Sequence, residues 1–210
     1  MNHALRFALP TMLLLAACSG GDDPASTEGG GSEADLTKEP SLTFGTWKST
    51  VCEAVDAVTF QRRTYKIAAN GVFADWERFS TASCAPESKL MTIRMGGSSK
   101  LDRLSQVVKY AAEIRVFIDE KAIVPASAAG LERLAKECPN AAWKVGQELD
   151  VTTKGCGSLV PAHDTCPIEY DLMRLQSGKL YFGDRAVPLC TEATRPKKLS
   201  IWGIAFDHAL

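Results

Sequence analysis

The chain has 210 residues, of which 23% are charged and 45% are hydrophobic, and its formal net charge is −1. This length suits one globular domain with short flanking segments. Lysine and arginine are scattered along the sequence and form no basic patch. The charge pattern therefore gives no indication of a nucleic-acid partner.

The beginning of the chain has the features of an export signal. Arg6 supplies a positive charge, and the apolar stretch at residues 7–17 is too short to span a bilayer, which needs about 20 residues. The stretch ends in Leu15-Ala16-Ala17-Cys18, which resembles the lipobox of bacterial lipoproteins. The alternative is an ordinary signal peptide with an incidental cysteine.

The lipobox resemblance implies that residues 1–17 are removed and that Cys18 receives lipid. Several acyl chains on one residue make membrane attachment stable, and no second apolar run of membrane length follows. Ser19, in place of Asp, resembles the default outer-membrane sorting class of Gram-negative lipoproteins. We therefore expect an envelope protein anchored through Cys18, facing the periplasm or the outside.

The next segment is predicted to be a tether. Residues 18–40 are mostly Gly, Ser, Asp, Glu, Pro and Thr, and such a composition buries too little apolar surface to fold. Residues 41–210 are predicted to form a single domain. Six cysteines remain after Cys18, and an even number in an exported chain implies disulfides. Their spacing is poor for metal binding, so we expect no metal and no cofactor.

A two-residue hydrophobic period dominates this domain and predicts half-buried strands. It occurs at residues 91–95, 112–118 and 143–151. Asn70-Gly71 is a strong hairpin signal, and Ser177-Gly178 separates two further strands in a similar way. One short helix is predicted near residues 128–138, with Ser127 as its N-cap and Pro139 after its end.

Several short motifs occur together in the domain. They are G-x-W-x-S-x-x-C-E at residues 45–53, R-x-Y at 63–65, W-x-V-G at 143–146, D-V-T at 150–152 and G-C at 155–156. Their order and spacing resemble one domain of the adenomatosis polyposis coli down-regulated proteins, which are membrane-anchored inhibitors of Wnt signalling in animals. The similarity extends through most of residues 42–200.

This resemblance implies a mainly β fold, in which a curved antiparallel sheet forms a clam or open, lipocalin-like barrel with an apolar cleft for acyl chains. Animal members carry two such domains and a transmembrane anchor, whereas one domain and a lipid anchor are expected here. Wnt ligands are absent from bacteria, so the Wnt partner does not carry over to this chain. The resemblance also implies the disulfides Cys52–Cys84 and Cys138–Cys156. Cys166–Cys190 then pairs the two cysteines that remain.

Two polar groups have alternative interpretations. Glu53 and Arg63 match the family pattern, and they form either a buried ion pair or two solvated charges. Residues of hydrolase or metal-site type also gather at Ser158, His163, Asp164 and Glu169. No G-x-S-x-G or H-E-x-x-H motif accompanies them. An ordinary polar loop explains them, so we expect neither catalytic residues nor an enzyme.

The apolar strand faces are the candidate ligand site. The alternative is that the same residues form a dry core, as most apolar strand residues do. The predicted lining is Met91, Ile93, Met95, Ile114, Val116, Ile118 and Trp143. The expected function is non-enzymatic binding of a lipid or other hydrophobic ligand. The alternative is an envelope interaction or structural protein that binds an unidentified protein by its surface.

Overall fold

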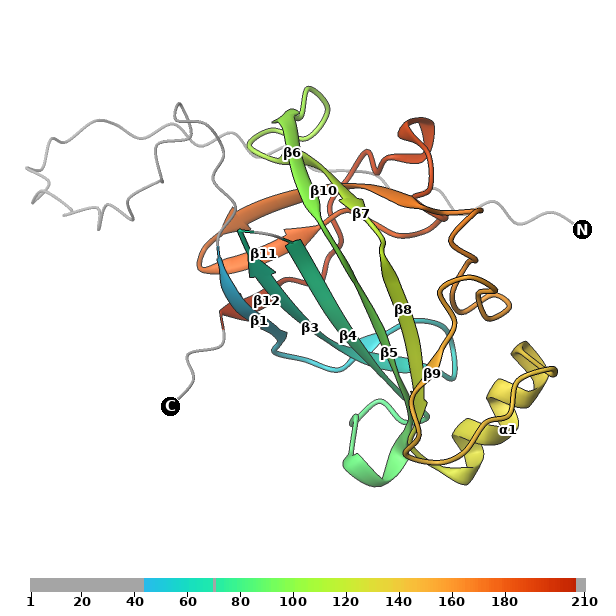
Figure 1. Cartoon of the computed structure of the whole chain (residues 1–210). Helices are drawn as coiled ribbons and strands as arrows, with labels where there is room; N and C mark the ends of the chain where they lie inside the picture. Colours follow the sequence, from blue (N-terminus) through green and yellow to red (C-terminus); the bar gives the residue numbers. More distant parts are fainter. Residues whose placement is uncertain (1–43, 70, 207–210) are drawn as a thin grey trace, which may run out of the picture. The chain divides into compact units, whose positions relative to one another are not determined.

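The computed structural model describes residues 44–69 and 71–206, with the backbone alone at Phe206. This part of the chain is mainly antiparallel β with one α-helix, and its sheet curls into a half-barrel (Figure 1). The predicted fold class is therefore confirmed. The predicted signal peptide, Cys18 and the tether to residue 40 lie outside the described residues.

The elements follow one another with short connections. The helix is α1 (Ala128–Glu137), and two short 3-10 helices cover Pro86–Ser88 and Glu192–Thr194. The strands are β1 (Gly45–Ser49), β2 (Glu53–Ala54), β3 (Phe60–Ala68), β4 (Gly71–Phe79), β5 (Lys89–Gly97), β6 (Ser99–Leu104), β7 (Ala112–Phe117), β8 (Glu120–Pro125), β9 (Leu149–Asp150), β10 (Ile168–Gln176), β11 (Lys179–Phe182) and β12 (Ile204–Phe206).

All these strands belong to one sheet with the order β6-β7-β10-β11-β12-β1-β3-β4-β5-β8-β9, and β2 pairs with β3 beside β1. A long hairpin explains why the sheet curls. Its first arm is β5 followed by β6 and its second arm is β7 followed by β8, with β5 paired to β8 and β6 to β7. The same hairpin therefore supplies both ends of the sheet order, which must turn towards each other (Figure 1).

The hairpin bends where two strands approach closely. A Cβ at Gly97 would lie 1.8 Å from the carbonyl oxygen of Phe117, so only glycine permits this contact. The amide of Phe117 donates to the carbonyl of Ser98, and the amide of Asp119 donates to that of Gly96. The bend lets β5 continue the β3–β4 side of the sheet while β7 joins β10 on the other side.

Most predicted strands are confirmed, and one is wrong. Residues 91–95 lie in β5, residues 112–117 form β7, and the Ser177-Gly178 turn joins β10 to β11. Both turn residues have positive φ, as a two-residue hairpin turn of this type requires. Strands β3 and β4 pair from Phe60 with Phe79 to Ala68 with Gly71, and Asn70 lies outside the described residues.

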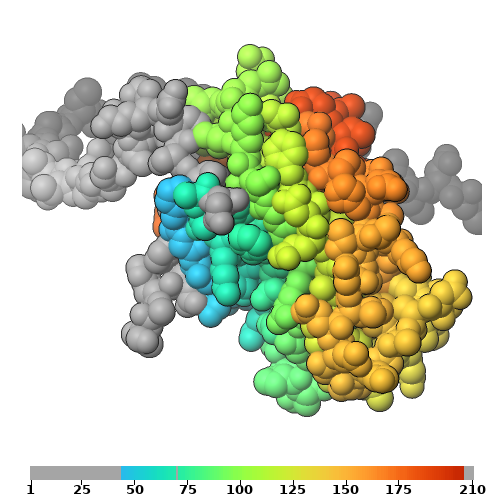
Figure 2. Space-filling model, viewed as in Figure 1, coloured from blue at the N-terminus to red at the C-terminus, as the bar shows by residue number. Residues whose placement is uncertain are grey.

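The predicted strand at residues 143–151 is limited to β9. Gly146 adopts a φ of 75°, which interrupts an extended backbone. The amide of Gln147 donates to the carbonyl of Lys144, so these residues form a turn. Periodicity alone could not reveal this, because alternating residues are compatible with an irregular segment. Figure 2 shows the segment between α1 and β10, in orange, covering the molecule beside β8.

The helix prediction is confirmed. The side chain of Ser127 accepts a hydrogen bond from the amide of Gly130, and α1 ends immediately before Cys138 and Pro139. The predicted disulfide pairing is also confirmed, with Cys52 bonded to Cys84, Cys138 to Cys156 and Cys166 to Cys190.

Candidate functional site

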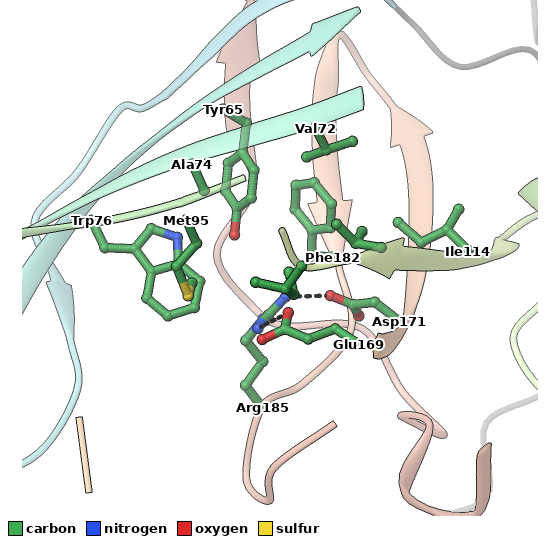
Figure 3. Close-up of a pocket in the computed structure, with 12 residues that line it drawn as sticks. Tyr65, Val72, Ala74, Trp76, Met95, Ile114, Glu169, Asp171, Phe182 and Arg185 are labelled. Atoms are coloured by element: carbon green, nitrogen blue, oxygen red, sulfur yellow. Dashed lines mark hydrogen bonds and ion pairs between the residues drawn. The ribbon is translucent and has the colours of Figure 1, made fainter. Parts of the chain in front are cut away.

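A small cavity lies on the concave side of the half-barrel, between its β3–β5 side and its β7–β11 side. Its volume is about 20 Å³, which is room for about one water molecule. Figure 3 shows the lining side chains converging on this space from both sides of the sheet. The lining consists of Tyr65, Val72, Ala74, Trp76, Met95, Ile114, Val116, Ile118, Glu169, Asp171, Phe182 and Arg185.

Cross-strand pairing brings one wall of the cavity together. Tyr65 pairs with Ala74, and Ala74 pairs with Met95 across β3, β4 and β5. Because directly opposed residues point to the same face of a sheet, all three side chains face the concave side. Phe182 of β11 stacks on Tyr65, with ring centroids 4.3 Å apart and planes inclined by 25°. The two sides of the half-barrel therefore meet through aromatic rings.

A charge cluster forms the opposite wall, and in it Asp171 is buried while Arg185 and Glu169 are half-buried. Arg185, from the irregular segment after β11, donates to Glu169 at 2.9 Å and to Asp171 at 2.7 Å. Its guanidinium also lies 5.1 Å from the centroid of the Trp76 ring, a cation–π distance. Asp171 accepts two further bonds, from the amides of Leu172 and Gly183. The contacts with Glu169, Asp171 and Trp76 thus fix the position of the Arg185 guanidinium.

Burial and pairing act on these groups in opposite directions. Burial raises the pKa of the Asp171 carboxyl above its ordinary value, and the positive charge of Arg185 only partly opposes this. Burial alone would lower the pKa of Arg185, but Glu169 and Asp171 together raise it. Arg185 therefore stays charged, and the ion pair persists inside a largely apolar environment.

Three hydrogen-bond donors in the lining have no acceptor among the described residues. They are the hydroxyl of Tyr65, the indole nitrogen of Trp76 and the Nε of Arg185, and each of these atoms is buried. Arg63 lies 5.9 Å from the centroid of the Tyr65 ring; burial lowers the pKa of Arg63, but its interaction with Tyr65 helps to raise it. Because an arginine side chain only donates hydrogen bonds, the hydroxyl hydrogen of Tyr65 is still left without an acceptor. Buried donors without partners are uncommon in folded proteins. Figure 3 shows the Tyr65 hydroxyl directed into the cavity towards Arg185.

The Glu53–Arg63 pair is buried, which decides between the two interpretations given above. Arg63 donates from Nε at 2.7 Å and from Nη2 at 3.2 Å to the two carboxylate oxygens of Glu53. Only 4% of Arg63 and none of Glu53 is exposed. The hydroxyl of Ser49 and the side-chain amide of Gln61 also donate to the carboxylate of Glu53. The pair ties β2 to β3.

The structure brings together four of the seven predicted ligand residues. Met95, Ile114, Val116 and Ile118 line the cavity. Ile93 and Met91 lie on β5 two and four residues before Met95, but they are fully buried core residues outside the lining. Periodicity assigns all of them to one face and cannot separate a lining residue from the core.

Trp143, the seventh predicted ligand residue, lies elsewhere, in an open groove of about 590 Å³ between the end of α1 and the segment after β9. Its indole nitrogen donates to the carbonyl of Cys138. The groove wall mixes Trp143, Leu149 and Val151 with the polar side chains of Asp150 and Lys154. This groove is separate from the concave cavity.

The loop residues of hydrolase type do not converge. Ser158 donates to Glu137, Glu169 binds Arg185, and His163 lies 3.6 Å from an exposed Asp164. Among the described residues, no group of three His, Cys, Asp or Glu side chains could hold a metal ion. Within the same residues, no helix is long and apolar enough to cross a membrane.

Sequence reasoning missed the polar half of the site. Glu169 and Asp171 alternate with more apolar residues along β10, so two carboxylates share the face of this strand that lines the cavity. Such a pair requires a cation nearby, which was a usable signal. The partner itself, Arg185, lies in an irregular segment that has no periodicity.

Comparison with known proteins adds nothing to this geometry. No protein-family model matches the chain, and no curated protein matches it. Function is therefore inferred from the chemistry of the site.

Proposed function

We propose that this protein is a non-enzymatic, membrane-anchored lipoprotein that binds a lipid or another long apolar ligand on the concave side of its half-barrel. The observation that carries the proposal is the cavity lining. Apolar side chains from β3, β4, β5, β7 and β11 converge on unfilled space in a curled sheet whose described end strands, β6 and β9, do not pair with each other.

A ligand of acyl-chain size requires this space to expand. Sites for such molecules have volumes of about 300–1,000 Å³, whereas the cavity has about 20 Å³. All the described lining residues lie on strands except Ile118, which directly follows β7, and Arg185, which lies in the irregular segment after β11. Segments with few backbone ladder bonds open at a lower free-energy cost than paired strands. We therefore infer that the ligand enters as the segment carrying Arg185 moves outwards.

The energetics of this exchange are feasible. An acyl chain gains about 0.8 kcal/mol for each methylene that leaves water, so ten methylenes gain about 8 kcal/mol. Moving the Arg185 segment outwards opposes ligand entry, because the partly buried ion pairs with Glu169 and Asp171 are strained during the opening. Complete loss of a fully buried ion pair costs about 3–5 kcal/mol, which is an upper bound for this step. Met95 supports the exchange because a methionine side chain adapts to ligands of variable shape.

The anchor is supported by the sequence Leu15-Ala16-Ala17-Cys18. Lipid on Cys18 would hold the half-barrel close to its ligands in the envelope membrane. Changing Cys18 to Ala should stop processing at this position, and the intact mass of the mature protein measures this. A mature protein that begins elsewhere and retains a free Cys18 thiol would contradict the anchor.

A matched pair of substitutions tests the ligand site. Ala74→Leu adds volume inside the cavity lining. Ala122→Leu makes the same change on β8 at a position paired with the exposed Arg94, away from the cavity. In the full chain, binding of the neutral fluorescent probe N-phenyl-1-naphthylamine should be weakened about tenfold by the first substitution and left unchanged by the second. Circular dichroism verifies that both variants fold.

Two measurements on the wild-type chain can contradict the proposal. If the wild-type chain does not bind the probe saturably, and carries no lipid when extracted and examined by mass spectrometry, the hydrophobic-ligand proposal is wrong. The surface-interaction alternative would then replace it. Equal probe binding by the wild type and Ala74→Leu would place the ligand outside this cavity.

A further inference from the structure

We infer that the cavity recognises a neutral oxygen acceptor, the carbonyl of an acyl ester, and that the ligand is an uncharged ester and not a free fatty acid or a lipid phosphate. This inference rests on the proposed function, because it names the polar group of the ligand bound at the same site. Hydrogen bonds from the cavity to this carbonyl would select an ester over an apolar molecule without an acceptor.

The unsatisfied atoms determine the kind of partner. The indole nitrogen of Trp76 and the Nε of Arg185 can only donate hydrogen bonds, and the hydroxyl of Tyr65 can also donate. All three atoms are buried and have no partner among the described residues. The complementary group must therefore be an acceptor, and a carbonyl oxygen offers two lone pairs without a hydrogen of its own.

The charges around the cavity exclude an anion. Arg185, the only cation in the described lining, is already neutralised by Glu169 and Asp171. The adjacent Arg63 is held by Glu53 in two hydrogen bonds. An entering carboxylate or phosphate would therefore meet the buried Asp171 and the half-buried Glu169, with no unpaired cation among the described lining residues. Like charges that are shielded from water repel each other.

Another buried cation, Lys121, is directed towards backbone carbonyls outside the lining. Lys121, on β8 opposite Met95, donates from Nζ to the carbonyl oxygens of Pro161 at 2.8 Å and Cys166 at 3.3 Å. It is not part of the lining. A neutral carbonyl carries no net charge to be repelled, and it satisfies the donors that an alkane would leave unpaired.

The position of the donors fits an ester within an acyl ligand. Tyr65 and Trp76 are aromatic residues of the cavity lining, and each carries a buried polar atom without a partner among the described residues. Phe182 stacks directly on Tyr65. A carbonyl oxygen could thus fill the small polar space while the attached chain lies along the neighbouring rings and Met95.

The test compares three probes with the full chain by displacement of N-phenyl-1-naphthylamine. The probes are methyl dodecanoate, dodecanoate and dodecane. We expect the ester to displace the dye at a lower concentration than dodecanoate at neutral pH. Tyr65→Phe should weaken ester binding about fivefold, which corresponds to about 1 kcal/mol for one hydrogen bond, and it should leave displacement by dodecane unchanged.

Two further variants act as checks. Trp76→Phe removes a second donor and should also weaken ester binding relative to dodecane. Tyr110→Phe removes a hydroxyl at the exposed turn between β6 and β7 and should have no effect on any probe.

The outcomes separate this inference from the proposed function. If none of the three probes displaces the dye and the dye itself does not bind, the proposed function fails, and this inference fails with it. If the probes bind but dodecanoate is preferred, the charge argument is wrong. If Tyr65→Phe affects the ester and dodecane equally, the donors hold only water, and hydrophobic binding stands without ester recognition.

Discussion

Individual charged residues do much to determine how the interior of the half-barrel is arranged. Glu53 with Arg63 forms a buried ion pair that connects β2 to β3, and Arg185 forms partly buried ion pairs that connect the segment after β11 to Glu169 and Asp171 of β10. The sequence identified Glu53 and Arg63 as a candidate ion pair because both match the pattern of the family that the chain resembles. It could not decide their burial, because that depends on β2 folding back beside β3. The Glu53–Arg63 pair now supports a specific test.

Glu53→Gln should destabilise the protein by about 3–5 kcal/mol, because it leaves the Arg63 guanidinium buried without a counter-charge. Unfolding by urea measures the change. Glu148→Gln is the control, since it breaks an ion pair with Arg94 in which both side chains are about half exposed, and such pairs contribute at most about 1 kcal/mol. Equal effects of the two substitutions would show that the Glu53–Arg63 pair is not buried in solution.

The burial of Lys121 can be tested through the pH dependence of the protein's stability. Burial lowers the pKa of its ammonium group, and Glu169 only partly opposes the shift. Between the folded-state pKa and the ordinary value of about 10.5, the unfolded chain binds more protons than the folded chain. Stability due to Lys121 therefore rises with pH across this window.

The measurement is the unfolding free energy of the wild type minus that of Lys121→Met, taken at about pH 7 and about pH 10. The difference should increase with pH, and other titrating groups largely cancel because both proteins share them. A difference that falls with pH would mean that the Lys121 charge is stabilised, not penalised, in the folded protein.

At the scale of elements, local signals were reliable where the backbone is regular. The cap at Ser127 located α1, and the Ser177-Gly178 turn located the β10–β11 hairpin. The segment at 143–148 failed because alternation of side chains does not fix the backbone, and Gly146 turns it out of the extended region. Close approaches between elements also have no local signature, and Gly130 is an example.

Gly130→Ala should destabilise the protein by about 1–3 kcal/mol, although alanine is the better helix former by about 1 kcal/mol. The reason is contact with β5, since a Cβ at this position would lie 1.9 Å from the carbonyl oxygen of Leu90. Glu132→Ala, at an exposed position of the same helix, should change stability by less than about 0.5 kcal/mol. Thermal unfolding followed by circular dichroism distinguishes the two, and a stabilising Gly130→Ala would mean that α1 does not pack tightly on β5.

For the whole molecule, the two-residue period and the family resemblance together predicted a curved antiparallel sheet. Periodicity gave strands but not their order. The curl arises from a hairpin that bends at Gly97 and contributes to both ends of the sheet, and nothing in a local pattern specifies this. The cavity was only partly predictable for the same reason, because Met95 and Ile114 meet across the curl and Arg185 enters from an irregular segment.

The disulfides link this architecture to the proposed opening. The segment that carries Arg185 begins at the end of β11 and is fixed again at Cys190, which is bonded to Cys166 just before β10. Replacing Cys166 and Cys190 by Ser should cost about 3 kcal/mol of stability in the chain-entropy model. It should also increase binding of N-phenyl-1-naphthylamine under native conditions, because one end of the segment is released.

The control replaces Cys138 and Cys156 by Ser. This removes a disulfide with a sequence separation of 18 residues, close to the 24 residues between Cys166 and Cys190. Its loss of stability should be similar, about 3 kcal/mol, but it lies beside α1 and outside the cavity lining. Dye binding should therefore stay at the wild-type level. Equal dye binding in the two double variants would show that general loosening, and not release of the Arg185 segment, admits the probe.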